Sequence, residues 1–154
     1  MVISSGILAF RRSARELEFF LVHPGGPFFV KREDGCWTIP KGLVQDQEEL
    51  LVAARREFLE ETGFEVSGYF IDLGSVVQKG GKRVHCFAVE FDLDPTLLVS
   101  NTFELEWPPR SEKMVSFAEV DRGAWFDLSM ASVKINPAQV PLLSRLVEML
   151  DSSG

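Results

Sequence analysis

Cysteine is scarce in this sequence of 154 residues, and the two present, Cys36 and Cys86, have neither the number nor the spacing of a disulfide framework or a metal site. We expect both to be reduced and at least one to be buried. Long apolar runs are lacking too: none reaches about 18 residues, and no basic segment precedes the first apolar run. These absences exclude a disulfide-stapled secreted domain and a helical membrane protein, and they predict a cytoplasmic protein with no membrane partner.

Basic residues are also few, with 16 Lys and Arg against 23 Asp and Glu and a net charge of −7. Because nucleic-acid polymers are bound through clustered basic side chains, this balance predicts no such partner. A small polyphosphate remains acceptable, since metal ions and a few local cations can offset its charge. With 45% hydrophobic residues and no internal repeat, the chain fits a single globular domain over residues 1–154.

The most informative feature that is present is an acidic pattern over residues 42–64. Gly42, Glu48 and the run from Arg56 to Phe64 fit G-x5-E-x7-R-E-U-x-E-E-x-G-U, where U is bulky and apolar. Seven fixed residues at background frequencies of roughly 5 to 7% each should coincide by chance in on the order of one in a million chains of this length. The acidic pattern is therefore a specific signal.

Three glutamates of the acidic pattern, Glu57, Glu60 and Glu61, share one face of a helix, because residues three and four apart are neighbours there. Like charges crowded within roughly 100° of arc repel one another. A hard divalent cation would hold all three ionised, so the spacing predicts a site for Mg²⁺ or Mn²⁺. Arg56 lies beside the acids and can neutralise and orient them.

The alternative interpretation is a solvated acidic face with weak ion pairs. It accounts for each acid separately, but not for both glycines, Glu48 and Arg56 falling at the required spacings. For Glu48 alone the alternative stays open, because an acid near a helix start also complements the helix dipole.

Local signals also frame the helix that carries the acids. Asp46 and Glu49 have the spacing of an N-cap and its capping-box acid, and Gly63 suits a left-handed C-cap, so we expect a helix from about Gln47 to Thr62. The residues expected to pack against a sheet are Leu50, Leu51, Ala54, Phe58 and Leu59.

Strand signals precede and follow this helix. Residues 3–11 and 17–23 read as paired strands joined by polar residues 13–16, and residues 37–42 read as a short strand and turn. Two more strands are expected over about 69–79 and 83–91, with Gly80 and Gly81 as a two-residue hairpin turn.

The remainder of the chain is less regular. Residues 94–113 resemble a long loop or insertion, 114–117 a short strand, and 121–126 a short helical turn. A final helix is predicted with Asn136 as its cap and Pro137 at its first position. Its apolar stripe, expected to face the core, comprises Val140, Leu143, Leu146, Val147 and Leu150.

The acidic pattern and the order of elements together resemble the Nudix (MutT-like) hydrolases over most of the chain. The resemblance implies an α/β fold, an α/β/α sandwich with a mixed sheet, in which the acidic pattern forms a loop, a helix and a loop. It implies hydrolysis of a nucleoside diphosphate linked to another moiety, with Mg²⁺ or Mn²⁺ activating the water that attacks phosphorus. Glu57, Glu60, Glu61 and the Gly42 carbonyl would be the metal ligands, and Arg56 would orient them.

A finer resemblance is to the asymmetrical diadenosine tetraphosphate hydrolases. Residues 37–42, WTIPKG, are similar to their W-T-x-P-K-G segment, and Glu119 stands six residues before Trp125 as a glutamate does in that subgroup. This implies Glu119 as a candidate general base, while an ordinary loop acid or helix cap is the alternative. The sequence departs from the subgroup at Cys86, where its members usually carry a tyrosine.

Candidate phosphate-binding cations follow from position. Lys41 precedes the loop glycine, and Lys79 and His85 flank the hairpin; His85 could equally be a satisfied strand histidine. Lys82 and Arg83 read as solvated charges, and His23 carries no signal. Loops 24–35 and 94–113 are expected to shape a nucleotide pocket, with a dimer contact or plain surface as alternatives, so a monomer and a homodimer both remain open.

Three functions remain compatible with the sequence. The first is hydrolysis of a dinucleoside polyphosphate or similar nucleotide. The second keeps the reaction but acts on a nucleoside triphosphate, an NDP-sugar or a non-nucleotide pyrophosphate. The third is a non-catalytic nucleotide-binding module, which the complete set of acids disfavours.

Overall fold

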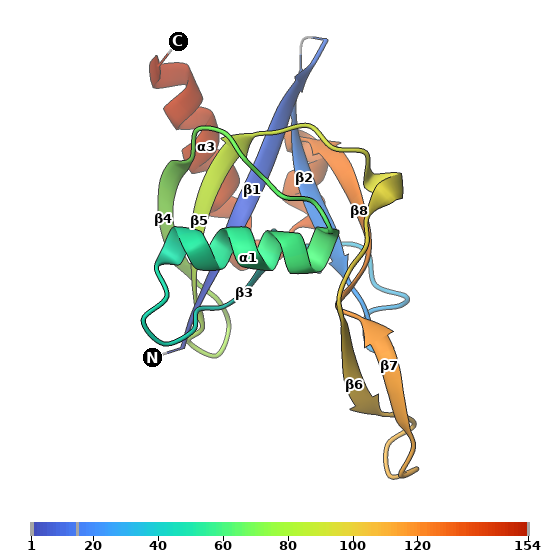
Figure 1. Cartoon of the computed structure of the whole chain (residues 1–154). Helices are drawn as coiled ribbons and strands as arrows, with labels where there is room; N and C mark the ends of the chain where they lie inside the picture. The colour runs from blue at the N-terminus through green and yellow to red at the C-terminus, as the bar shows by residue number, and fades with distance from the viewer. Residues whose placement is uncertain (1, 15, 154) are drawn as a thin grey trace.

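The computed structural model describes residues 2–14 and 16–153, and Figure 1 shows a twisted mixed sheet between helices. The elements are β1 (Ile3–Ser13), β2 (Glu16–Pro24), β3 (Lys41–Leu43), α1 (Leu50–Thr62), β4 (Ile71–Val77), β5 (Arg83–Glu90), the 3₁₀ turn η1 (Pro95–Leu97), β6 (Thr102–Glu106), β7 (Met114–Ala118), β8 (Val120–Asp127), α2 (Leu128–Lys134), the 3₁₀ turn η2 (Pro137–Gln139) and α3 (Val140–Ser153). The main sheet has the order β4-β5-β1-β2-β8, with β3 pairing β1. β1 is parallel to β5 and antiparallel to β2, which makes the sheet mixed.

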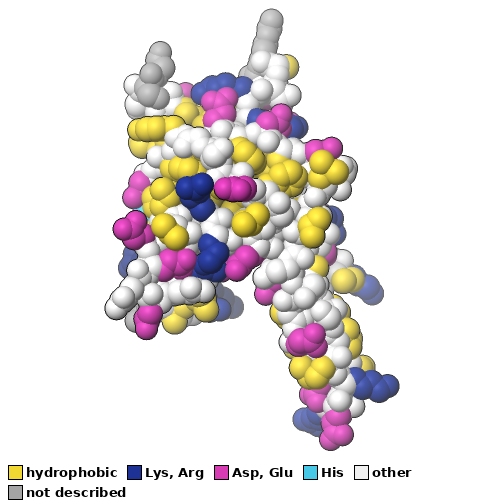
Figure 2. All heavy atoms as spheres, in the orientation of Figure 1, with side chains coloured by type: hydrophobic (Ala, Val, Ile, Leu, Met, Phe, Trp, Pro, Cys, Tyr) yellow, Lys and Arg dark blue, Asp and Glu magenta, His cyan; other side chains and the backbone are white. Residues whose placement is uncertain are grey.

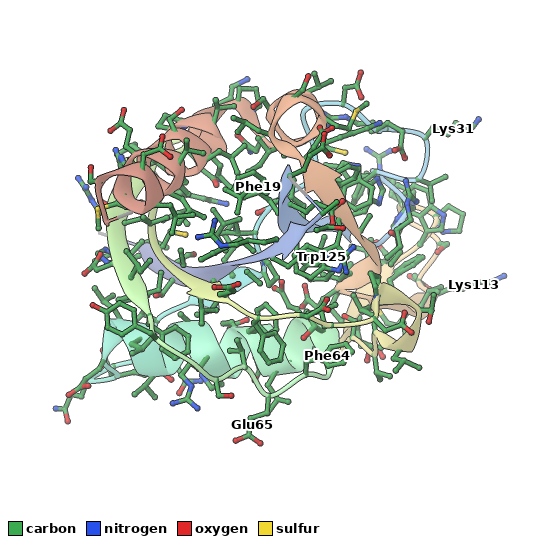
Figure 3. All side chains as sticks on the ribbon, turned by 90° about the horizontal axis from the view of Figure 1, so that it is seen from above. Phe19, Lys31, Phe64, Glu65, Lys113 and Trp125 are labelled. Carbon is green, nitrogen blue, oxygen red and sulfur yellow. The ribbon has the colours of Figure 1, made fainter. Side chains whose placement is uncertain are left out.

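The sheet is covered on both faces, as Figure 3 shows from above: α1 lies on one side and α2 with α3 on the other. Alternate residues of β1 point to opposite faces, so Ile7 and Ala9 join the core under α1, while Leu8 and Phe10 join the core under α3. Burial of both faces explains why β1, β2 and β5 read as nearly continuous apolar runs. The predicted α/β/α sandwich with a mixed sheet is confirmed.

Several local predictions are confirmed as well. β1 pairs antiparallel with β2, and β4 and β5 form the expected hairpin. Its turn differs from the prediction: Gln78 pairs with Lys82, so residues 79–81 form a three-residue connection, in which the Gly81 N–H donates to the Gln78 carbonyl over 3.0 Å and Gly80 and Gly81 both have positive φ values. Of residues 13–16, Ser13 pairs with Glu16, and Arg15 lies outside the described residues. Both cysteines are free and buried.

The predicted start of the acid-bearing helix is wrong. α1 begins at Leu50 with Glu49 as its N-cap, and no side chain caps it. Gln47 has a φ of 62°, so the chain turns at this point instead of entering the helix. The expected packing of Leu59 is also wrong, since this side chain is 47% exposed. The predicted end is right: Gly63 is left-handed, and its N–H donates to the Leu59 carbonyl over 2.8 Å.

Three segments differ from the sequence prediction, and in the first two long-range pairing overrides the local signals. Residues 121–126 belong to β8, which pairs with β2 along its length, and do not form a helical turn. Residues 94–113 contain the 3₁₀ turn η1 and β6, which pairs with β7, so this segment is not simply a loop. In the 37–42 segment only Lys41 and Gly42 are in a strand, while Trp37 and Thr38 form single bridges.

The final helix is reached in two steps. α2 was not foreseen; it follows β8 directly, and the Asp127 side chain caps it. Asn136 acts as the predicted cap, accepting from the Ala138 N–H over 2.9 Å, but the turn that it caps is η2, and α3 begins at Val140. Leu143 and Leu146 are fully buried. No helix within the described residues is long and apolar enough to cross a membrane.

Candidate active site

The acidic pattern forms the loop, helix and loop that runs from β3 past α1. Gly42 lies opposite Ser5 of β1, and the Ser5 hydroxyl donates to the Leu50 carbonyl at the start of α1 over 2.6 Å. Ala54 and Phe58 bury the inner face of α1 against the sheet. These contacts fix the helix so that its acidic flank lies beside β3. A Cβ atom on Gly42 would collide with the Glu57 carboxylate, which explains the need for glycine there.

Arg56 organises the acids on this flank. Its Nε and Nη2 donate to both oxygens of Glu48 over 2.8 and 3.0 Å, and its Nη1 donates to Glu57 over 2.9 Å and to Glu60 over 3.1 Å. Nη2 also donates to the Leu43 carbonyl over 2.9 Å. The guanidinium therefore holds Glu57 and Glu60 together while its own position is fixed from the loop.

Glu48 is an anchor for Arg56 and is not part of the Glu57–Glu61 group. Its carboxylate accepts from Arg56 and from the Gln45 N–H over 3.0 Å, and these hydrogen bonds lower its pKa to about 2. This resolves the open alternative for Glu48, because an ionised bidentate partner of Arg56 does more than complement a helix dipole.

Glu61 lies deepest among the acids. Burial, followed by the nearby charge of Glu57, raises its pKa to about 8, although its Oε1 accepts from the Lys41 N–H over 3.2 Å. Burial also raises the pKa of Glu57, with Glu60 and Glu119 adding to the effect. Carboxylates that resist ionisation in this way are stabilised by a bound cation.

Glu119 approaches the same group from the other end of the chain. Its charge acts on Glu57, Glu61 and Lys41. Backbone hydrogen bonds set its place: the Glu119 N–H donates to the Asn101 carbonyl over 2.9 Å, and the Asn101 N–H donates to the Glu60 carbonyl over 2.7 Å. Two segments about 60 residues apart in sequence thus meet at α1.

The donor set suits a hard divalent cation, because every candidate ligand offers oxygen. Within residues 2–14 and 16–153, however, no three Asp, Glu, His or Cys side chains are arranged around a single point. Arg56 spans Glu57 and Glu60, while Glu61 faces the backbone of Lys41. Loading the site therefore requires carboxylate rotations, and the raised pKa of Glu61 supplies the electrostatic reason for a cation to bind there.

The other predicted cations do not all gather here. Lys41 lies among the acids, and its burial lowers the pKa of its ammonium group against the opposing effect of Glu61. Lys79 is exposed on the β4–β5 hairpin. His85 lies on β5 with its Nε2 2.7 Å from Asp72, which favours the alternative of a satisfied strand histidine.

A cavity of about 210 Å³ opens beside Lys41. The loop after β2 contributes Phe29 and Arg32, and three amide side chains are among the other lining residues. These amides, which the sequence did not single out, are Gln78, Asn136 and Gln139. A larger cavity of about 570 Å³ lies between the β1–β2 turn and α3, and none of its lining residues belongs to the acidic pattern. We take the smaller of these two cavities as the candidate substrate pocket, because it is the one lined by Lys41, which lies among the acids.

Fold and acidic flank together define a class, a pyrophosphohydrolase built on an α/β/α sandwich. The chain belongs to the NUDIX domain family, whose model matches residues 3–146. Nudix enzymes generally use divalent metal ions and bind small nucleotide substrates, and membership with a complete acidic pattern supports an enzyme of this kind.

Solved structures share this fold. The NUDIX domain of Shewanella oneidensis NrtR, complexed with ADP ribose, is 16% identical with a TM-score of 0.68, covering 97% of this chain and 88% of that one. A binary complex of the C. elegans Ap4A hydrolase is 20% identical with a TM-score of 0.66, covering 99% of both chains. A mutT/nudix family protein from Listeria innocua is 17% identical with a TM-score of 0.64, covering 99% and 95%. No curated protein matches this sequence.

Proposed function

We propose that this protein hydrolyses a phosphoanhydride bond in a nucleoside diphosphate linked to another moiety, with dinucleoside polyphosphates as the substrate class. The observation that carries the proposal is the acidic flank of α1, where Arg56 holds Glu57 and Glu60, Glu61 accepts from the Lys41 N–H, and the charge of Glu119 acts on the same group. Mg²⁺ or Mn²⁺, held by Glu57, Glu60, Glu61 and the Gly42 carbonyl, would supply the positive charge that stabilises the reacting phosphate and acidifies water.

Each side chain has a role in this proposal. Arg56 keeps Glu57 and Glu60 oriented, as its hydrogen bonds indicate. A water oxygen attacks phosphorus, Glu119 accepts the proton that this water releases, and the bridging P–O bond breaks so that the second phosphate leaves with its electron pair. Lys41 neutralises a non-bridging phosphate oxygen. Lys79, exposed on the hairpin, and His85, held by Asp72, are weaker candidates for substrate contact.

The choice of a dinucleoside polyphosphate is supported by three features. The WTIPKG segment and Glu119 match that subgroup, and the C. elegans Ap4A hydrolase shares the fold over the full length of both chains. The third is the cavity beside Lys41, where Phe29 offers a ring and Gln78 and Asn136 offer amides to a moiety beyond the phosphates.

The test is a panel of nucleotides and dinucleotides, each assayed with Mg²⁺ and with Mn²⁺ and with products resolved by chromatography. The wild-type protein should cleave diadenosine polyphosphates with the highest kcat/KM. Glu61→Gln should lower kcat by on the order of 10²- to 10³-fold and weaken Mn²⁺ uptake in calorimetry. Glu65→Gln is the matched control, since Glu65 is exposed and points away from the sheet in Figure 3. Full activity in Glu61→Gln would refute the assigned site.

An NDP-sugar is the second candidate, because the NrtR NUDIX domain with the same fold was solved with ADP ribose. Its sugar, which is smaller than a second nucleoside, would have to occupy the cavity beside Lys41. In the panel, preferential cleavage of ADP-ribose over diadenosine polyphosphates would select this candidate, and no cleavage of any compound would support a binding module.

A further inference from the structure

His23 is fully buried near the end of β2, and both of its ring nitrogens face acceptors. Nδ1 lies 2.9 and 3.1 Å from the two carboxylate oxygens of Asp121, and Nε2 lies 2.7 Å from the Arg32 carbonyl oxygen. The Asp121 carboxylate also lies 3.7 Å from the Arg122 guanidinium, which can only donate, so the carboxylate is the acceptor toward the ring. Both nitrogens must therefore donate, which only the doubly protonated imidazolium can do.

This arrangement, the His23 bridge (the His23 ring, the Asp121 carboxylate and the Arg32 carbonyl), joins two parts of the candidate site. Asp121 lies two residues after Glu119, the proposed general base. Arg32 belongs to the loop of residues 25–36, which lines the cavity beside Lys41. The loop and the β7–β8 junction are also joined where the Gly25 N–H donates to the Glu119 carbonyl over 2.9 Å.

Other charged and aromatic groups around the ring keep the bridge in place. The Trp37 ring packs edge-on against His23 with centroids 5.3 Å apart. Arg122 pairs with Glu33 of the loop and lies over the Trp37 ring, 5.2 Å from its centroid. The imidazolium is therefore sealed from water and matched by one carboxylate, so a neutral side chain would leave a buried acceptor unpaired.

We propose that His23 is a positioning residue, whose doubly protonated ring fixes the loop of residues 25–36 relative to Glu119. The proposal rests on the proposed function, in which the cavity takes the second moiety and Glu119 takes the proton. Loss of the bridge frees the Arg32 carbonyl and the Asp121 carboxylate. The loop then holds the second moiety less firmly, and the Glu119 side chain is placed less precisely, while its backbone keeps the hydrogen bonds with Asn101 and Gly25.

The protonation state of the ring can be read without any activity. The sequence has two histidines, His23 and His85. The His85→Gln variant keeps only the His23 imidazole, so its spectrum identifies the His23 signals. In a long-range ¹H–¹⁵N correlation of the wild-type protein at neutral pH, both ring nitrogens of His23 should be protonated. A neutral tautomer, with one protonated nitrogen, would overturn the proposal.

Two variants test the positioning role. His23→Gln removes the charge, and Asp121→Asn removes the acceptor while keeping its shape. For a diadenosine polyphosphate, each should lower kcat about tenfold, the loss expected from one charge-assisted hydrogen bond, and should raise KM. For a nucleoside polyphosphate without the second nucleoside, kcat should fall equally while KM stays unchanged. The double variant should lose no more than either single variant, because both remove one shared interaction.

Arg145→Gln is the matched control for a purely structural effect. Arg145 donates to the Leu73 and Ser75 carbonyls over 3.0 and 2.9 Å, on the edge strand β4 and away from the acids. Its loss should lower stability but leave kcat and KM unchanged. Wild-type kinetics with both substrates in His23→Gln and Asp121→Asn would overturn the proposal.

Hydrogen exchange separates a failure of this inference from a failure of the proposed function. If the wild-type protein cleaves nothing in the panel, the proposed function fails on its own. His23→Gln should still exchange faster than Arg145→Gln in residues 25–36 and 119–122. Equal exchange in these segments would overturn the positioning role whatever the substrate is.

Discussion

At the residue scale, the acidic flank of α1 is governed by one guanidinium. Arg56 donates five hydrogen bonds, two to Glu48, one each to Glu57 and Glu60, and one to the Leu43 carbonyl. This leaves Glu61 as the acid that Arg56 does not neutralise, and burial makes its charge costly. Glu61 is therefore the acid whose ionised form would gain most from a bound cation, because Arg56 does not neutralise it.

The metal-free protein should lose stability as pH rises. The pKa of Glu61 is about 8 in the folded state, against an ordinary value of 4.5 in the unfolded chain. Between these values the folded state keeps a proton that the unfolded state has released, so the free energy of unfolding falls with increasing pH. Urea unfolding in EDTA, measured at pH values from about 5 to 8, should show this fall.

Glu61→Gln should remove most of that pH dependence. In the wild-type protein, added Mg²⁺ should restore the stability that is lost at the alkaline end, because metal ions bind the ionised carboxylate. A wild-type stability that rises over this range, or an unchanged slope in Glu61→Gln, would contradict the burial of an uncompensated acid.

Gly42→Ala should separate folding from activity. The new Cβ would push aside the end of a flexible side chain, the Glu57 carboxylate, so the unfolding midpoint should change little. The displaced carboxylate could no longer share a cation with Glu61, and kcat should fall about 10²-fold, as when a ligand geometry is lost.

Gly74→Ala is the opposite control. Gly74 has a φ of 78° in the bulge of β4, where an added Cβ would make only an ordinary contact, 3.5 Å from Arg145 Nη1, so the backbone strain should cost about 1 kcal/mol of stability without altering kcat. Thermal unfolding and steady-state kinetics on both variants check the contrast, and full activity in Gly42→Ala would count against Glu57 as a ligand.

At the element scale, the β6–β7 ribbon stands apart from the rest of the fold. Figures 1 and 2 show it projecting from the body, with apolar, basic and acidic side chains on its surface. Its apolar residues meet the loop after β2, where Phe28 packs edge-on against Trp107 and Phe103 lies against Gly26. A lone two-stranded ribbon adds little stability in water, so the ribbon is steadied by contacts such as these with the loop.

Excision of the ribbon should therefore be tolerated. Thr102 and Ala118 are paired neighbours, so residues 103–117 can be replaced by a two-residue Asn-Gly turn. The midpoint of thermal unfolding should fall by less than about 5 °C, because few core residues are removed. KM for a dinucleoside polyphosphate should rise, since the loop after β2 loses the support of Phe103 and Trp107. Global unfolding in circular dichroism would show that the ribbon is part of the cooperative core.

At the scale of the whole molecule, sheet order assembles the site. β8 pairs with β2, β2 with β1, and β1 with β3, so the start of β8 and the loop before α1 converge at one end of the sheet. Arg145 of α3 covers the carbonyls of the edge strand β4 at the other side. This edge is thereby protected from pairing with other chains.

The charge of the molecule leads to a prediction about partners. NrtR, whose NUDIX domain shares this fold, was also solved with a 27mer DNA. The similarity to that structure covers 96% of this chain and 61% of the NrtR chain. With a net charge of −7, the present chain should not bind a duplex of that length in a mobility-shift assay at about 0.15 M salt. A salt-sensitive shift at micromolar protein would contradict this expectation.

Features that depend on neighbours along the chain could be predicted from the sequence alone. The acidic pattern, the left-handed Gly63, the hairpin around Gly80 and the paired strands β1 and β2 follow from spacings of a few residues, and all are found in the structure. Periodicity and turn preferences act over such distances, so they can be read without tertiary contacts.

The remaining features depend on contacts between residues far apart in the sequence. The start of α1 depends on Glu48 pairing with Arg56 beyond it, and β8 exists because β2 offers it an edge, whatever its local preference. Glu119 beside Lys41 and the His23 bridge to Asp121 join residues nearly 80 and 98 positions apart. Such contacts are set by the order of strands in the sheet, which no short window of sequence encodes.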